Sequence, residues 1–233
     1  MSDTHALPKY VQISELLIRD IQAGRLADGE RLPPERDMAA RLGISVGTLR
    51  KSLDELTALG LLDRVQGSGN YVCAQEDTQS VYAFFRVELI EGGGLPTAEL
   101  LSVDRLPKPK GLPPFGQAAD GHRIRRLRRL NGIPAVLEEI WLDGSYIDQI
   151  DAVALRESLY LYYRETLGLW ITKAEDRLDL AEVPDWAPGA FGCDVGQPCM
   201  RATRISYGPE AEAAEASWNW INTDVARYVA RIT

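Results

Sequence analysis

The sequence predicts an α+β protein in which a small helical unit with a β-hairpin precedes a larger domain built on an antiparallel sheet. Two observations carry this prediction. Residues 31–72, RLPPERDMAARLGISVGTLRKSLDELTALGLLDRVQGSGNYV, contain two stretches with helical spacing that meet at a glycine and run into a tight hairpin. From about residue 81 the apolar residues recur with a period of two, which is typical of half-buried strands. We therefore expect two domains, over residues 1–73 and 81–233, joined by a polar linker over residues 74–80.

Proline and glycine mark the ends of the helices in the first unit. Pro33 and Pro34 lack N–H groups and fit only at a helix start, so a helix begins near Pro34. Gly43 permits the positive φ that ends this helix, and Ser45 can then cap the next one by accepting hydrogen bonds from its free N–H groups. An earlier helix over residues 8–23 completes a three-helix core. The apolar stripe of the third helix consists of Leu49, Leu53 and Leu56.

Three helices followed by a hairpin form a winged helix-turn-helix, a shape that reads DNA by placing a helix in the major groove. The third helix presents small residues and then basic ones, and residues 41–51 carry three basic side chains and no acid. The hairpin glycines allow close approach to phosphates or to a minor groove. A pair of short helices around a glycine also occurs in ordinary α-helical domains, which is the plainer alternative. The pattern predicts that the residues facing DNA include Val46, Gly47, Thr48, Arg50, Lys51 and Gln66.

The order and spacing of LPPER, LGIS, a basic helix and RVQGSGNYV resemble the GntR family of bacterial transcription regulators, over residues 8–73. The DNA contacts that this resemblance implies are Arg36, Ser45, Thr48, Arg50 and Gly67. Many members carry an arginine directly after the serine of the turn, whereas Val46 stands here. We therefore expect base readout to rest more on Arg36, Thr48 and Arg50.

Composition limits the partners and the compartment. The net charge of -8 argues against a protein that coats nucleic acid non-specifically, so we expect the acidity to lie mostly in the second domain. Cys73, Cys193 and Cys199 are too few for a disulfide framework, and no metal-site spacing accompanies them. No apolar stretch approaches the roughly 20 residues that cross a bilayer, and MSDTHALPKY lacks a signal-peptide pattern. We expect a cytoplasmic protein with no cofactor, no metal and no membrane partner.

The second domain is predicted to consist of antiparallel strands interrupted by one helix. The strands are expected in VYAFFRVELI, AELLSVDRL, HRIRRLRRL and PAVLEEIWL, and then over residues 170–183, 198–207 and 213–221. Helical spacing covers residues 154–168. Asn131-Gly132 is a strong signal for a two-residue turn between two of the strands.

The hairpin through Asn131-Gly132 brings several arginines together. With Leu130 opposite Ile133, the expected facing pairs on one side are Arg128–Ala135, Arg126–Leu137 and Ile124–Glu139. On the other side, Arg125 and Glu138 are expected to form a solvent-exposed pair. Guanidinium groups bind carboxylate or phosphate bidentately, so Arg126 and Arg128 beneath apolar walls would hold a small anion. The alternative, weighted equally, is that all these arginines form a solvated strand face.

Residues 82–228 resemble the UTRA effector-binding domain of the HutC subfamily, through RIRRLRRLNGIPAVLEEIWL, the SLY at 158–160 and the closing EASWNWINTDVARY. The resemblance implies a fold like that of chorismate lyase. The effector contacts that it implies are Arg126, Arg128, Ser158, Tyr160 and Glu215. Some sugar-phosphate-binding members have a tyrosine where Ile221 stands, so we expect a less polyhydroxylated ligand. Helix capping by Ser158, packing by Tyr160 and cross-strand pairing by Glu215 are the plainer alternatives.

These features predict a ligand-responsive transcription regulator, most often a repressor in this family, that binds a near-palindromic operator as a homodimer. The effector would bear a carboxylate or phosphate and would bind one arrangement of the DNA-binding heads better than another. One alternative is a lyase-like enzyme domain on a DNA-binding head, although the chain has only two histidines and no cysteine beside a base. Another alternative is a second domain that serves only for dimerisation.

Overall fold

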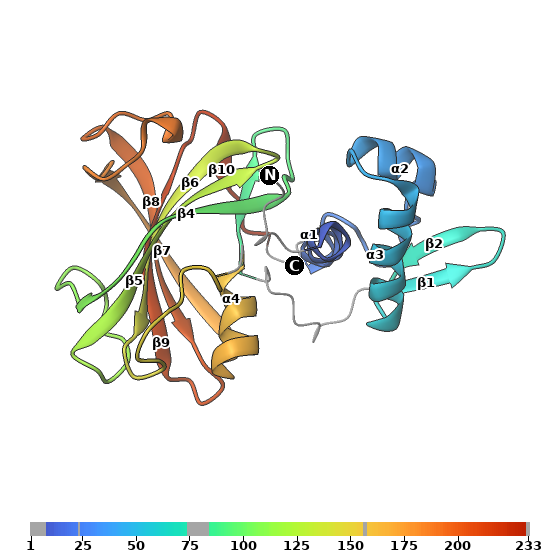
Figure 1. Cartoon of the computed structure of the whole chain (residues 1–233). Helices are drawn as coiled ribbons and strands as arrows, with labels where there is room; N and C mark the ends of the chain where they lie inside the picture. The colour runs from blue at the N-terminus through green and yellow to red at the C-terminus, as the bar shows by residue number, and fades with distance from the viewer. Residues whose placement is uncertain (1–7, 23, 74–83, 156–157, 232–233) are drawn as a thin grey trace. The chain divides into compact units, whose positions relative to one another are not determined.

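The computed structural model describes residues 8–22, 24–73, 84–155 and 158–231, and it divides into two compact units (Figure 1). The first unit is Met1–Phe85 with Ala230–Thr233, and the second is Arg86–Val229. The linker expected over residues 74–80 lies outside the described residues. Among the helices described, none is long and apolar enough to cross a membrane.

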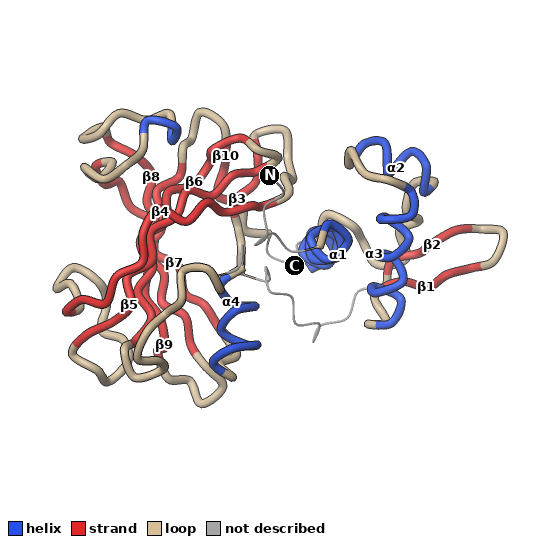
Figure 2. The backbone as a smooth tube through the Cα atoms, in the orientation of Figure 1, coloured by secondary structure: helices blue, strands red, loops and turns tan. Residues whose placement is uncertain are grey.

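The first unit contains three helices and a two-stranded antiparallel hairpin, which confirms the winged helix-turn-helix (Figure 2). Its elements are α1 Lys9–Gln22, α2 Glu35–Arg41, α3 Val46–Ala58, β1 Leu62–Val65 and β2 Gly69–Val72. Val65 pairs with Gly69, so the hairpin closes through a turn at residues 66–68. The expected last residue of the first helix, Ala23, lies outside the described residues.

Local hydrogen bonds and one buried stripe explain where the helices of this unit begin and end. Pro34 is the N-cap of α2, and Gly43 has a φ of 63° shortly after α2 ends. Ser45 is extended, and its Oγ accepts a hydrogen bond from Thr48 N at 3.0 Å, so Ser45 caps α3 as expected. The apolar stripe of α3, at most 1% exposed, is Leu49, Leu53 and Leu56. Burial of each leucine contributes about 1.5–3 kcal/mol.

A six-stranded antiparallel sheet forms the second unit (Figure 2). Its strands, in spatial order, are β4 Pro96–Pro107, β5 Asp120–Leu130, β6 Ile133–Asp143, β9 Ala213–Ile221, β8 Pro198–Tyr207 and β7 Lys173–Glu182. Two short strands, β3 Val87–Leu89 and β10 Ala226–Tyr228, pair with each other separately. Residues 198–207 and 213–221 are strands as predicted, whereas the strand expected over residues 81–90 is limited to β3 among the described residues.

A β-bulge changes the register of the β5–β6 hairpin. Leu130 faces Ile133 as expected, but the ladder skips Ala135. Beyond it the observed pairs are Arg128–Val136, Leu127–Leu137, Arg126–Glu138, Arg125–Glu139 and Ile124–Ile140. The pairs expected beyond the bulge are therefore wrong by one residue, because the bulge contains one extra residue of β6, Ala135, that has no partner in β5. As a result Glu138 lies beside Arg126 instead of forming an exposed pair with Arg125.

The sheet has two chemically different faces. Strand alternation and the observed register place Arg126, Arg128 and Glu215 on one side, which we call the arginine face. Trp218 and Trp220 lie on the other side, the tryptophan face, where Trp220 belongs to an apolar cluster of the core. The candidate effector residues therefore share one surface of the sheet.

A short helical segment packs on the arginine face. α4 spans Leu159–Tyr162 and continues as a π-helix over Tyr163–Leu167. The helix expected over residues 154–168 is shorter than predicted, since Ser158 is the N-cap and Gly168 ends the segment with a φ of 66°. Tyr163 Oη donates to Glu215 Oε2 at 2.7 Å, which connects this segment to β9.

Candidate DNA interface and effector site

The residues expected to contact DNA lie at the surface of α2, α3 and the hairpin. The exposed ones are Arg36, Ser45, Gly47, Arg50, Lys51, Gln66 and Gly67. Val46 and Thr48 are half-buried. The hydroxyls of Ser45 and Thr48 are 2.8 Å apart and hydrogen-bonded, so both side chains also support the start of α3. A Cβ added at Gly47 would meet only Ser45 Oγ, at 3.8 Å, which leaves open space at this end of the helix.

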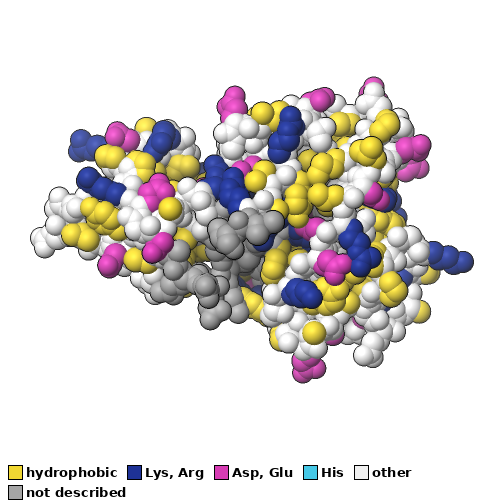
Figure 3. Space-filling model, turned by 180° about the vertical axis from the view of Figure 1, so that it is seen from behind, with side chains coloured by type: hydrophobic (Ala, Val, Ile, Leu, Met, Phe, Trp, Pro, Cys, Tyr) yellow, Lys and Arg dark blue, Asp and Glu magenta, His cyan; other side chains and the backbone are white. Residues whose placement is uncertain are grey.

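Acidic side chains from outside residues 41–51 lie beside the basic surface of α3. Arg50 Nε donates to Glu35 Oε2 at 2.6 Å, and Arg64 Nη2 lies 2.8 Å from Asp54 Oδ1. The fold therefore places one acidic side chain, Glu35 of α2, against the basic surface of α3. The Arg50 side chain remains 64% exposed while Glu35 holds its Nε. Basic and acidic side chains are also mixed over the face seen in Figure 3.

The hairpin is held by side-chain hydrogen bonds near its tip. Ser68 Oγ and Tyr71 Oη are 2.6 Å apart, and Arg64 Nε donates to Asn70 Oδ1 at 3.2 Å. Gly67 has a φ of 78°, a conformation that glycine adopts without strain. The exposed turn at Gly67 is thus carried on a well-defined hairpin.

Arg126 and Arg128 form a buried cluster with Glu138. They are 4% and 5% exposed, so the alternative of a solvated face does not hold for these two side chains. Arg126 Nη2 lies 2.6 Å from Glu138 Oε2, and Arg128 Nε lies 2.6 Å from Glu138 Oε1. Two guanidinium groups thus share one carboxylate.

The charges in this cluster do not balance. Burial opposes ionisation of Glu138, but the charges of Arg126 and Arg128 hold its pKa at about 2. Burial lowers the pKa of Arg126, and the neighbouring charge of Arg128 adds to this effect while Glu138 opposes it. Arg126, Arg128 and Glu138 together carry a formal charge of +1, which a bound anion would neutralise.

Glu215 is the centre of a second polar group on the arginine face. It is 2% exposed and accepts hydrogen bonds from Tyr163 Oη at 2.7 Å and Ser206 Oγ at 2.9 Å. Tyr160 Oη lies 2.9 Å from Ser206 Oγ, so Tyr160 and Glu215 are joined through Ser206. Burial raises the pKa of the Glu215 carboxyl, and the charge of Arg126 partly opposes this. Arg126 is thus close enough to link the two groups electrostatically.

Two of the five expected effector residues also have local structural roles. Ser158 is 2% exposed, and its Oγ accepts from Leu161 N at 3.3 Å as the cap of α4. Tyr160 is half-buried, and burial raises the pKa of its phenol. Sequence reasoning missed Tyr163 and Ser206, which bond directly to Glu215. In the sequence, Tyr163 belongs to an apolar stripe with helical spacing, which predicts packing rather than a polar contact. Nothing in the sequence distinguishes Ser206 from the other residues of its strand.

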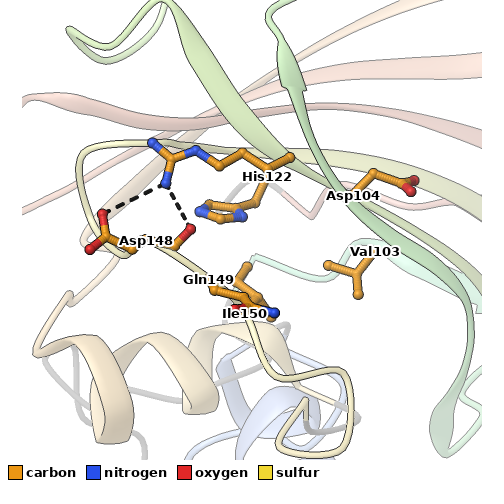
Figure 4. A pocket seen from close by; sticks show the side chains of 7 residues that line it. Val103, Asp104, His122, Asp148, Gln149 and Ile150 are labelled. Carbon is orange, nitrogen blue, oxygen red and sulfur yellow. Dashed lines mark hydrogen bonds and ion pairs between the residues drawn. The ribbon is translucent and has the colours of Figure 1, made fainter.

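A separate pocket of about 340 Å³ lies toward the start of β5 (Figure 4). It is lined by Val103, Asp104, Arg105, His122, Asp148, Gln149 and Ile150. Arg105 donates to Asp120 Oδ2 at 2.7 Å and to the Asp148 carbonyl at 2.7 Å, and His122 Nε2 donates to the Ile147 carbonyl at 2.7 Å. Its lining has one arginine and two carboxylates, Asp104 and Asp148, whose negative charges disfavour an anion, so this pocket is a poorer anion site than the Arg126–Arg128 cluster. Within the described ranges, no group of acidic, histidine and cysteine side chains could hold a metal ion.

Comparisons with known proteins agree with the two-unit architecture. The profile for bacterial regulatory proteins of the gntR family matches residues 9–72, and the UTRA domain profile matches residues 91–227. The HTH-type transcriptional regulator SmoD of Agrobacterium fabrum is 63% identical over 227 residues, which cover 97% of each chain. The HTH-type transcriptional repressor NagR of Bacillus subtilis is 26% identical over 214 residues, covering 90% of this chain and 88% of NagR.

Solved structures have the same fold. The crystal structure of YydK from Bacillus subtilis aligns with a TM-score of 0.52 at 20% identity, covering 97% of this chain and all of that chain. The ligand-binding domain of a GntR-family regulator from Bordetella bronchiseptica aligns with a TM-score of 0.55 at 22% identity, covering 64% and 98% of the two chains. The relatives are regulators rather than enzymes, so the lyase-like alternative is not supported. The chain belongs to the GntR family of bacterial transcriptional regulators that carry a UTRA domain, with DNA binding in the first unit and effector binding in the second.

Proposed function

We propose that this regulator is a homodimeric repressor whose operator binding is controlled by a small metabolite bearing a carboxylate or phosphate. The observation that carries the proposal is the buried cluster in which Arg126 and Arg128 share Glu138. A buried excess of positive charge is costly, and an anion that accepts hydrogen bonds from both guanidinium groups would relieve that cost.

The effector site in this proposal extends across the arginine face. Its members are Arg126, Arg128, Ser158, Tyr160 and Glu215. Glu215 supports a second kind of contact, because its buried carboxyl group accepts hydrogen bonds. An effector with an anionic end and a hydrogen-bond donor would suit both groups.

The DNA contacts in this proposal come from α2, the start of α3 and the hairpin turn. They are Arg36, Ser45, Val46, Gly47, Thr48, Arg50, Lys51, Gln66 and Gly67. Support comes from the open space at Gly47 and the exposure of the Arg50 guanidinium. The paired heads of a dimer would read an operator with two-fold symmetry, in the cytoplasm where the chromosome lies. The proposed domain limits remain residues 1–73 and 81–233.

A thermal-shift screen of the full chain tests the effector site. The panel contains carboxylates and phosphates, each with an uncharged counterpart, and inorganic phosphate alone. A true effector should raise the melting temperature of the wild type and of the control Arg129→Ala, which alters a half-buried arginine on the same strand. It should fail to stabilise Arg126→Ala and Arg128→Ala. Arg128→Lys keeps the charge but loses the planar fork, so partial stabilisation is expected there.

Two results would contradict the proposal. An anion that stabilises both alanine variants as strongly as the wild type would exclude the Arg126–Arg128 site. A stabilising anion that leaves the affinity for promoter DNA unchanged would remove the regulatory role. If no anion in the panel has either effect, the second domain would serve only for dimerisation.

A further inference from the structure

A short segment before α2 is paired with the edge of the β1–β2 hairpin. Arg31 forms an antiparallel bridge with Tyr71 of β2, and Leu32 N donates a hydrogen bond to the Asn70 carbonyl at 2.9 Å. The backbone of Arg31 is therefore fixed beside β2. The hairpin extends away from the helices of this unit (Figure 1), so Arg31 lies on an element that can reach a ligand outside the unit.

The side chain of Arg31 lies along the outer face of the hairpin. Residues that face each other across two strands share a face, and so do residues two apart along one strand. Arg31 therefore lies on the same face as Tyr71 and Gly69. The opposite face carries Asn70 and Val72, which are buried. A Cβ added at Gly69 would lie 3.2 Å from Arg31 Nε, so the Arg31 side chain fills the space that glycine leaves open near the turn.

Arg31 supplies a positive charge that the hairpin turn lacks. Residues 65–72, VQGSGNYV, contain no charged side chain. Arg64, directly before them, lies 2.8 Å from Asp54 and donates to Asn70 Oδ1. Arg31 is exposed, and in the part of the chain that the structure describes no ion pair links it to a carboxylate. Its charge is thus available to an anion that approaches the turn.

Two hydroxyl groups near Arg31 supply a neutral donor. Ser68 Oγ and Tyr71 Oη lie 2.6 Å apart, so one hydroxyl proton is used in their mutual hydrogen bond. Two hydroxyls carry two protons, and the pair therefore keeps one O–H for an acceptor outside the chain. Phosphate oxygens of DNA accept hydrogen bonds from arginine, serine and tyrosine side chains alike. The guanidinium group and the hydroxyl pair together form a donor set suited to one phosphate.

We propose that Arg31 and the Ser68–Tyr71 hydroxyl pair bind one phosphate of the DNA backbone for each DNA-binding head. This inference rests on the proposed contact of the hairpin turn with DNA, and it adds three residues to the contacts given above. A phosphate contact carries no sequence information, so it positions the hairpin and does not select bases. Arg31 thereby fixes where the exposed turn at Gly67 meets the duplex.

The salt dependence of DNA binding by the full-length chain tests the Arg31 contact. Each phosphate that a protein neutralises on B-DNA contributes about 0.9 to the slope of log affinity against log salt concentration. For each head, Arg31→Ala should lower the magnitude of this slope by about 0.9 and the affinity by about tenfold, equally on promoter and scrambled duplexes. Arg31→Lys keeps the charge and should keep the slope. Fluorescence anisotropy over a salt series measures both quantities.

Two further variants separate the charge from the hydroxyls and from the rest of the surface. Arg177→Ala is the matched control, since it removes an arginine that is 67% exposed in the second unit and should leave slope and affinity unchanged. The double variant Ser68→Ala/Tyr71→Phe removes both hydroxyls at constant charge, so it should weaken binding about fivefold without changing the slope. Melting followed by circular dichroism shows that each variant is folded.

A slope that Arg31→Ala leaves unchanged would overturn the phosphate contact, even if the affinity falls. A double hydroxyl variant that binds as tightly as the wild type would overturn the role of Ser68 and Tyr71. Gln66→Glu tests the placement of the turn separately, because an acid at a turn that touches DNA is repelled by the phosphates. If Gln66→Glu weakens binding and Arg31→Ala does not, the turn contact stands and the Arg31 contact fails. If neither variant weakens binding, both contacts fail.

Discussion

Substitution of Glu138 by glutamine isolates the energetics of the arginine cluster. The change keeps the size of the side chain and removes the one negative charge that Arg126 and Arg128 share. Both buried guanidinium groups would then lose the carboxylate that they share, and removing one partner of a buried ion pair is strongly destabilising. We expect Glu138→Gln to destabilise the second unit and to strengthen the binding of anions.

The size of the effect follows from the pKa of Glu138. It is lowered from 4.5 to about 2 in the folded protein, and each unit corresponds to about 1.4 kcal/mol, so the charged form contributes about 3 kcal/mol. Because the folded pKa is depressed, this stabilisation is present above pH 4.5 and is lost as the pH falls toward 2. The difference between wild type and Glu138→Gln should therefore be about 3 kcal/mol at pH 7 and should shrink in acid.

Urea unfolding followed by tryptophan fluorescence measures this difference in the correct unit. All five tryptophans of the chain lie beyond residue 140, so their emission reports the second unit. Glu99→Gln is the matched control, since it removes an exposed ion pair with Arg129 and should cost less than about 1 kcal/mol. Equal losses for Glu138→Gln and Glu99→Gln, or a difference that does not change between pH 7 and pH 3, would refute the reasoning.

Four further substitutions test other parts of the molecule. Arg50→Ala should cost roughly 1–3 kcal/mol of binding free energy for the promoter duplex. Glu35→Gln frees the Arg50 Nε and should strengthen binding to a scrambled duplex more than binding to the promoter. Fluorescence anisotropy on both duplexes measures these changes, and equal losses for Arg50→Ala on the two duplexes would show that Arg50 contacts only phosphate. Ser45→Ala should destabilise the first unit by about 1 kcal/mol in far-UV circular dichroism, and an unchanged unfolding midpoint would contradict the cap. Burial raises the pKa of Glu215 in the folded protein, so the wild type should lose stability relative to Glu215→Gln as the pH rises above 4.5. A difference in the free energy of urea unfolding that does not change with pH would contradict the raised pKa.

Local signals were enough to predict the elements of the first unit and several strands of the second. The α3 cap at Ser45 and the turn at Gly43 depend on the chemistry of one or two neighbouring residues. The limits of β8 and β9 follow from alternation bounded by turns. Such features need no knowledge of distant contacts, so a single sequence predicts them.

The bulge in β6 could not be predicted from alternation. Ala135, Val136 and Leu137 are all apolar, so the pattern looks the same whether or not one of them is skipped. A slip of one residue moves every later side chain to the opposite face. For this reason alternation alone predicts Glu138 opposite Arg125 in solvent, although Glu138 lies between two buried arginines.

Contacts between distant segments were also beyond the sequence pattern. Glu35 and Arg50 are separated by 15 residues, and only the packing of α2 against α3 brings them to 2.6 Å. Tyr163 and Glu215 are 52 residues apart and meet on the arginine face. The sequence predicted that Arg50 and Glu215 matter, but the groups that orient them came from the tertiary structure.

A half-buried arginine on the same face, Arg204, serves as an internal comparison for the anion proposal. Arg204 donates two hydrogen bonds to Asp176, both at 2.6 Å, and Tyr228 Oη donates to the same carboxylate at 2.8 Å. Burial opposes the charge of Arg204 as well, yet the hydrogen bonds and charge of Asp176 raise its pKa, whereas the pKa of Arg126 is lowered. The two arginines differ in how they are held: Arg204 makes two short hydrogen bonds to Asp176, whose charge also acts on Arg86, while Arg126 shares Glu138 with Arg128. Burial on this face therefore does not by itself lower the pKa of an arginine, since two short hydrogen bonds to one carboxylate offset it at Arg204 and not at Arg126.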